Sequence, residues 1–110
     1  MKYCLALDLV DNNDSILEYE NWHRKVWPGI IKSIRDAGIG GLEIYRVYNR
    51  LFMIMDTLPG FSFEKKKEMD ENNPLVIQWE SMMANFQQII PGTPAGSKWV
   101  LMNKVFDLND

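Results

Sequence analysis

Three short segments carry apolar side chains at consecutive positions, and this pattern restricts the fold more than any other. The segments are residues 3–7, 52–55 and 99–102. Because neighbouring side chains of a strand point to opposite faces, a strand built from any of these segments is apolar on both faces. A sheet made from them needs cover on both sides. Helices of the same chain can supply only one of these layers.

The first third of the chain predicts a strand followed by a long helical pattern. Residues 2–10 predict the strand. Ser15 and Glu18 have the spacing of a capping box, which indicates a helix start, and apolar residues at helical spacing follow. Pro28 lies inside this pattern, so we expect a kink or a second helical segment there. Gly38 predicts the end of the helix.

The remaining pattern completes an order of strand, helix, strand, strand, helix, strand. The later elements are predicted at residues 42–48 and 51–55 (a β-hairpin), 63–69 and 75–88 (helices) and 98–108 (a strand). This is the βαββαβ order of the ferredoxin-like α+β fold, an antiparallel sheet with its helices on one face. The helix-free face then exposes apolar side chains, which predicts a homodimer. We expect residues 1–110 to form a single domain.

Charge and composition narrow the classes of partner. The net charge is −3 and the basic residues are scattered, which argues against a nucleic-acid partner. No apolar run has membrane-spanning length, and the first one is interrupted by Asp8, so we expect neither a signal peptide nor a membrane partner. Cys4 is the single cysteine, which predicts a reduced thiol in a cytoplasmic protein.

The residues also limit the chemistry that the chain can support. One histidine and one cysteine offer no ligand pair at zinc or iron spacing, and no calcium-loop pattern is present. No Gly-x-Ser-x-Gly nucleophile motif occurs, and the glycines at 38–41 follow a helix instead of opening one. We therefore expect no metal and no other cofactor. The remaining possibilities for the function of the site are proton transfer and simple ligand binding.

The single histidine lies in an aromatic segment. In a continuous helix, Tyr19, His23 and Trp27 stand at i, i+4 and i+8 and project from one face. Their rings can stack on a hexose, and a histidine can gain or lose a proton near neutral pH. The same spacing is also typical of a buried core with a structural histidine, so this segment alone leaves both interpretations open.

Several segments together resemble the L-rhamnose mutarotase family. They are Tyr19-x3-His23-x3-Trp27-Pro28, Gly38-Ile39 with Ile44-Tyr45, Arg50-Leu51-Phe52, Trp79-x3-Met83 and Val105-Phe106-x-Leu108. The resemblance runs from about residue 2 to residue 108. It implies a dimeric α+β barrel that interconverts the α and β anomers of 6-deoxy sugars, so the expected ligand is a monosaccharide.

The same resemblance implies roles for individual residues. The family's proposed proton donor falls on His23 and a sugar-binding tyrosine on Tyr19. Two sugar-contacting positions on the second helix fall on Trp79 and Glu80, the latter in place of a second tryptophan. A further sugar-binding tyrosine of the family corresponds to Leu42. Leu42 and Glu80 thus differ from the residues of the rhamnose enzymes, which implies the same reaction on a different sugar. The stretches WPGIIKSIRDAGI, EIYRVYNRLFMIM and KWVLMNKVF resemble the L-fucose branch, so we expect L-fucose to be favoured over L-rhamnose.

Some alternatives stay open at this point. Glu80 is the best-placed second proton-transfer group by resemblance, with Tyr19 or water as alternatives. The βαββαβ dimer also hosts small monooxygenases and haem proteins, in which a lone histidine can hold the iron. A non-catalytic sugar-binding dimer, with His23 merely packed, is the other alternative.

Overall fold

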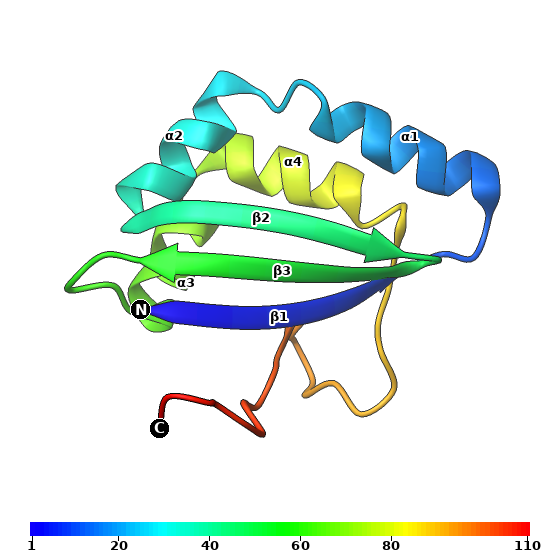
Figure 1. Cartoon of the computed structure of the whole chain (residues 1–110). Coiled ribbons are helices and arrows are strands. Elements are labelled where there is room, and N and C mark those ends of the chain that lie inside the picture. Colours follow the sequence, from blue (N-terminus) through cyan, green and yellow to red (C-terminus); the bar gives the residue numbers. More distant parts are fainter.

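The computed structural model describes residues 1–110 and contains one antiparallel sheet (Figure 1). Its strands are β1 (Lys2–Leu9), β2 (Ile39–Val47), β3 (Arg50–Thr57), β4 (Gln87–Gln88) and β5 (Val100–Leu101). β3 lies between β2 and β1, and the other edge of β1 pairs with both β4 and β5. This is the strand order of the ferredoxin-like fold, with the fourth strand divided into two short pieces. The predicted βαββαβ arrangement is confirmed.

Four helices pack with this sheet. They are α1 (Asn13–His23), α2 (Pro28–Asp36), α3 (Phe63–Glu71) and α4 (Pro74–Met83). α1, α2 and α4 lie over one face of the sheet, and α3 lies beside α4 (Figure 1). Pro28 is the first residue of α2, a position where its missing N–H costs no hydrogen bond. The expected second helical segment at Pro28 is therefore confirmed. None of the four helices has the length and apolar content that crossing a membrane requires.

The first helical region starts earlier than predicted and ends where predicted. α1 begins at Asn13, before the predicted capping box at Ser15. The reason is that the side-chain oxygen of Asn12 accepts a hydrogen bond from the Ser15 amide at 3.0 Å and so caps the helix. Gly38 follows α2 with a φ of 95°, a conformation that glycine adopts without steric strain, so the predicted helix end is confirmed.

The helix predicted at 75–88 is shorter than expected. α4 ends at Met83, and the chain then joins the sheet instead of continuing as a helix. The amide of Val10 donates to the carbonyl of Phe86 at 2.9 Å, and Gln87 and Gln88 pair with the end of β1. Tertiary pairing with β1 overrides the helical pattern here.

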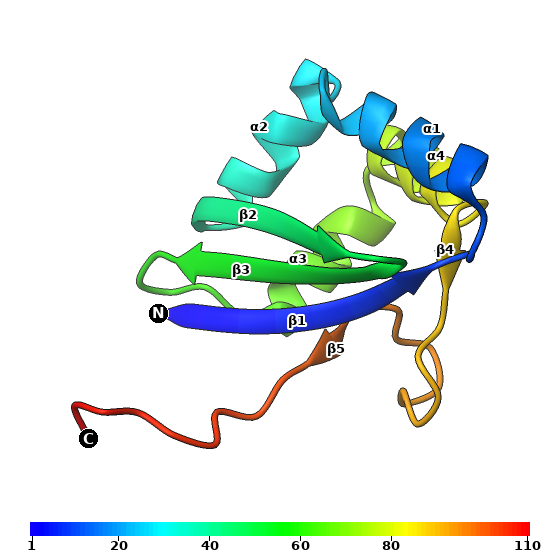
Figure 2. The same cartoon turned by 45° about the vertical axis from the view of Figure 1, so that its right-hand side comes forward.

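The strand predicted at residues 98–108 is wrong in length, because only β5 pairs with β1. Leu101 stands opposite Leu5 in this pairing. Continuing the same register would place Lys104 opposite Lys2, and directly opposed like charges destabilise a strand pair. After β5 the chain leaves the sheet edge and runs away from it (Figure 2).

The core lies between the sheet and the helices. Leu5, Leu7 and Leu9 alternate along β1 and are all buried. The larger buried cluster consists of Leu9, Ile16, Tyr19, Ile30, Leu51, Val76, Trp79, Met83 and Phe86. Tyr19 and Trp79 belong to this cluster, so two of the residues to which sugar contacts were assigned are also structural members of the core.

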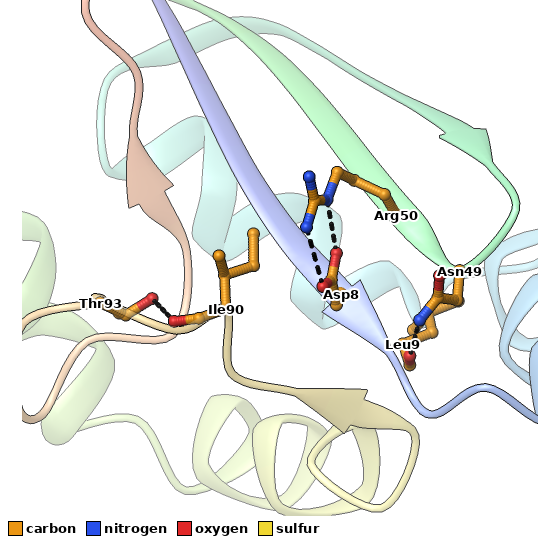
Figure 3. Close-up of polar contacts among 6 residues, drawn as sticks. All are labelled: Asp8, Leu9, Asn49, Arg50, Ile90 and Thr93. Carbon is orange, nitrogen blue, oxygen red and sulfur yellow. Dashed lines mark hydrogen bonds and ion pairs between the residues drawn. The ribbon is translucent and has the colours of Figure 1, made fainter.

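A partly buried ion pair joins β1 to β3 (Figure 3). Arg50 donates from Nε and Nη2 to the two carboxylate oxygens of Asp8, at 2.8 and 3.1 Å. The two residues stand directly opposite one another, and Asp8 is 7% exposed. Next to them, Asn49 donates from its side-chain amide to the carbonyl of Leu9 at 3.0 Å. These contacts hold the register of the two strands at the hairpin end.

We expect Arg50→Met to lower the free energy of unfolding, because the buried Asp8 carboxylate is then left without its charged donor. Denaturant titration at one fixed protein concentration measures this change. Lys104→Met is the matched control, since it removes the exposed pair with Asp107 and should change stability much less than Arg50→Met does. Equal effects of the two variants would contradict a stabilising role for the Asp8–Arg50 pair.

Candidate active site

A cavity of about 680 Å³ lies between the helices and the sheet, and it is open to solvent on one side. Its wall is mainly apolar, with a few polar side chains. All five residues selected from the sequence line it: Tyr19, His23, Leu42, Trp79 and Glu80. They come from α1, β2 and α4, so the fold brings together positions that are far apart in the chain. A mainly apolar cavity with a few polar groups is typical of a small-molecule site.

Tyr19 and His23 lie one helical turn apart on α1. Their ring centroids are 4.3 Å apart, and Tyr19 is 3% exposed. The Nδ1 atom of His23 lies 2.9 Å from the backbone carbonyl oxygen of Tyr19. A carbonyl oxygen only accepts, so Nδ1 carries the donated proton. Nε2 makes no hydrogen bond within the chain and is the ring nitrogen left to exchange a proton with a ligand.

Trp27 does not share a helix face with Tyr19 and His23. The expected i, i+4, i+8 arrangement is wrong, because α1 ends at His23 and Pro28 starts a new helix. Trp27 instead packs edge-on against Trp79, with ring centroids 5.0 Å apart, and it does not line the cavity. It supports the wall that Trp79 forms.

Trp79 forms an aromatic wall of the cavity from α4. It is 5% exposed, and its ring meets that of His23 edge-on at a centroid distance of 5.7 Å. Rings held on several sides in this way keep one orientation. Leu42, on β2, adds an apolar side chain to the lining. The site thus presents apolar surface suited to the C–H groups of a sugar.

The phenol of Tyr19 stays protonated at neutral pH. Burial raises the pKa of this phenol far above its ordinary value, and the negative charge of Glu80 raises it further. The side-chain amide of Gln87 acts in the opposite direction and lowers this pKa, with a smaller effect. Tyr19 is therefore a hydrogen-bond donor in this site and cannot act as its base.

Glu80 provides a carboxylate that is half exposed. Its Oε2 lies 3.8 Å from the ammonium nitrogen of Lys98, on the loop that precedes β5. An exposed pair of this kind contributes little to stability. Lys98 nevertheless places a positive charge beside the Glu80 carboxylate, and both residues line the cavity.

Gln87 and Lys98 are among the polar residues of the cavity that were not selected from the sequence. Gln87 falls within the predicted helix at 75–88 and Lys98 begins the predicted last strand. Neither position belongs to a motif, and only the pairing of β4 and β5 with β1 brings them to the site. No signal in the sequence marks them.

Charged side chains of α2 and α3 line the cavity as well. They are Arg35 and the ion pair in which the ammonium nitrogen of Lys66 lies 2.5 Å from a carboxylate oxygen of Asp70. Neither here nor elsewhere in the structure do histidine, cysteine and carboxylate side chains gather in groups of three that could hold a metal ion.

Comparison with known proteins points to one family. The family model described as L-rhamnose mutarotase matches residues 2–108. A curated L-fucose mutarotase from Xanthomonas campestris is 37% identical over 99% of this chain and 89% of its own length. A crystal structure of an L-rhamnose mutarotase from Formosa agariphila superposes with a TM-score of 0.71 at 20% identity, covering 98% of each chain.

A second solved structure supports the fold alone. It is described as a dimeric ferredoxin-like protein from an uncultured marine organism. Its TM-score is 0.53 at 12% identity, and the match covers 96% of this chain and 90% of the other. Both solved neighbours therefore agree with the α+β antiparallel arrangement described above.

Proposed function

The chain belongs to the L-rhamnose mutarotase family, and we propose that it interconverts the α and β anomers of a 6-deoxy-L-hexose, with L-fucose favoured over L-rhamnose. It is an isomerase of the mutarotase type. The L-fucose mutarotase that is 37% identical supports the choice of sugar. Cys4 is a free thiol, which supports a cytoplasmic location.

The observation that carries this proposal is the position of His23. Its Nδ1 is tied to the carbonyl of Tyr19, and its ring lies in the cavity between Tyr19 and Trp79. A histidine that is only packed needs no free ring nitrogen beside a cavity. An acid–base group requires one, because the proton must reach the ligand.

Mutarotation needs two proton transfers and no change of oxidation state. In ring opening, the ring oxygen gains a proton as its bond to C1 breaks, and the hydroxyl on C1 loses a proton as the carbonyl forms. Rotation about the C1–C2 bond presents the other carbonyl face, and ring closure reverses both transfers. General acid–base catalysis of this kind contributes about 10²–10⁴-fold.

We assign the two transfers to His23 and Glu80. The protonated His23 donates from Nε2 to the ring oxygen, and the carboxylate of Glu80 accepts the proton from the C1 hydroxyl. Ring closure returns both protons, so the enzyme ends each cycle unchanged. Tyr19 is excluded as the base by its raised pKa and instead donates a hydrogen bond to the sugar.

The sugar preference rests on Leu42 and Glu80. L-fucose and L-rhamnose differ at the hydroxyls on C2 and C4, while both carry a methyl group at C6 that an apolar wall accommodates. A carboxylate can accept hydrogen bonds from two hydroxyls, whereas an indole offers only a stacking surface and one donor. The axial C4 hydroxyl of L-fucose is the contact that we assign to Glu80.

The helix-free face of the sheet supports the proposal of a homodimer. Cross-strand pairing sets Ala6, Phe52 and Tyr45 side by side on this face. Tyr45 is 54% exposed and Val47, two residues further along β2, is 67% exposed. Apolar residues beyond β5 are also exposed, namely Val105, Phe106 and Leu108. A second copy of the chain, packed sheet to sheet, would cover these side chains, and the solved ferredoxin-like neighbour is itself described as dimeric.

We expect His23→Asn to lower the rate of anomer exchange by about 10²–10⁴-fold, because the variant keeps polarity but has no titrating group. Saturation-transfer NMR between the two anomer signals measures this rate. Lys25→Asn, an exposed change two residues away, should leave the rate unaltered. A folded His23→Asn protein with the wild-type rate would show that His23 is structural.

We expect faster exchange for L-fucose than for L-rhamnose in the wild-type protein. Glu80→Trp should slow exchange of both sugars, because it removes the proposed proton acceptor, and it should also shift this ratio toward L-rhamnose, since it removes the acceptor assigned to the C4 hydroxyl. Leu42→Tyr, which leaves the carboxylate in place, should shift the ratio in the same direction. Both sugars are compared under identical conditions by the NMR exchange measurement. Equal or greater wild-type activity on L-rhamnose would rule out the sugar assignment but not the mutarotase activity.

We expect sedimentation of a dimer at micromolar concentration in analytical ultracentrifugation. Phe52→Lys places a charge in the middle of the helix-free face and should yield monomers. Leu17→Lys is the control, because Leu17 is an exposed apolar residue of α1, away from this face. A wild-type monomer at this concentration would contradict the proposed assembly.

A further inference from the structure

Gln87 is held firmly at the edge of the sheet. It belongs to β4 and stands opposite Leu9 of β1. Leu9 is fully buried in the core beneath the helices, and directly opposed residues point to the same face, so Gln87 also points toward the helical layer. Its neighbour Gln88 is exposed and points the other way.

The side-chain oxygen of Gln87 is shut off from solvent and has no hydrogen-bond partner in the chain. It is the one buried side-chain polar atom in the structure with this property. Buried polar groups in folded proteins are nearly always paired, because an unpaired one destabilises the fold. The unpaired side-chain oxygen of Gln87 therefore needs an explanation other than stability.

The surroundings of Gln87 supply that reason. The residue lines the cavity together with Tyr19, His23, Trp79 and Glu80. Its amide lies close enough to Tyr19 to affect the ionisation of the phenol. A carboxamide presents one acceptor and two donors side by side, which suits the hydroxyl groups of a sugar ring.

We propose that Gln87 is a substrate-contacting residue that determines specificity, with its carboxamide hydrogen-bonded to a ring hydroxyl of the bound sugar. The Gln87 oxygen loses no hydrogen bond when the side chain rotates toward the cavity. Rotation about the terminal torsion of a glutamine side chain costs little energy. The unpaired oxygen finds its partner only when the sugar is present. This inference rests on the proposed mutarotase function and names a further contact of the same site.

Gln87→Met tests the proposal, because methionine keeps the length and approximate volume of the side chain and removes the amide. We expect kcat/KM for anomer exchange of L-fucose to fall about tenfold, the effect of one hydrogen bond to a neutral group. The Tm should change little, since the variant removes an unpaired buried oxygen together with the contact of the amide to the Tyr19 phenol. Gln88→Met is the matched control and should change neither quantity.

Deoxy sugars separate a direct contact from a packing effect. L-fucose analogues lacking the hydroxyl at C2, C3 or C4 are compared between the wild-type and Gln87→Met proteins. For the analogue that lacks the contacted hydroxyl, the difference between the two proteins should vanish. Gln87→Asn, which shortens the amide by one methylene, should reproduce the loss if the methionine variant folds poorly.

The measurements distinguish a failure of the proposed mutarotase function from a failure of the role assigned to Gln87. A wild-type protein that does not accelerate anomer exchange would overturn the proposed function itself. An active wild type with an equally active Gln87→Met variant would overturn the role of Gln87 alone. A loss of equal size on all three deoxy analogues, accompanied by a lower Tm, would show that Gln87 only packs, and would also overturn this inference.

Discussion

Strand β1 is the element on which the rest of the structure depends. It pairs with β3 along one edge and with β4 and β5 along the other. Its leucines face the helices, while Asp8 faces the opposite side and is held there by Arg50. A shift of one residue in the pairing would exchange the two faces and move Asp8 into the core. The register of this one strand therefore determines where the helices pack and which edge receives the end of α4.

The cavity shares its walls with the core. Tyr19 packs against Phe86, which lies just before β4, and Trp79 packs against both His23 and Trp27. The burial that stabilises the fold also keeps the Tyr19 phenol protonated. Aromatic groups at this site are thus rigid because they are core residues, and the imidazole of His23 gains its orientation from the backbone of its own helix.

The two kinds of residue at the site come from different parts of the fold. The aromatic residues Tyr19 and Trp79 lie on α1 and α4 and are buried in the core, with His23 beside them. Glu80, Gln87 and Lys98 line the cavity from α4, β4 and the loop that precedes β5. Substitutions at these three positions would alter the polar lining of the cavity and would disturb the core less than substitutions at Tyr19 or Trp79.

The sequence determined the order of elements, the helix-bearing sheet and the position of Tyr19 and His23 one turn apart on the same helix. These depend on local signals: side-chain alternation in strands, helical spacing, and the backbone limits of Pro28 and Gly38. Only the tertiary structure decided that α4 stops at Met83, that the last strand is short, and that Gln87 enters the cavity. Each of these outcomes depends on pairing with β1, an interaction between residues distant in the chain. Local propensity carries no information about such a pairing, because its free energy comes from a partner that the segment itself does not contain.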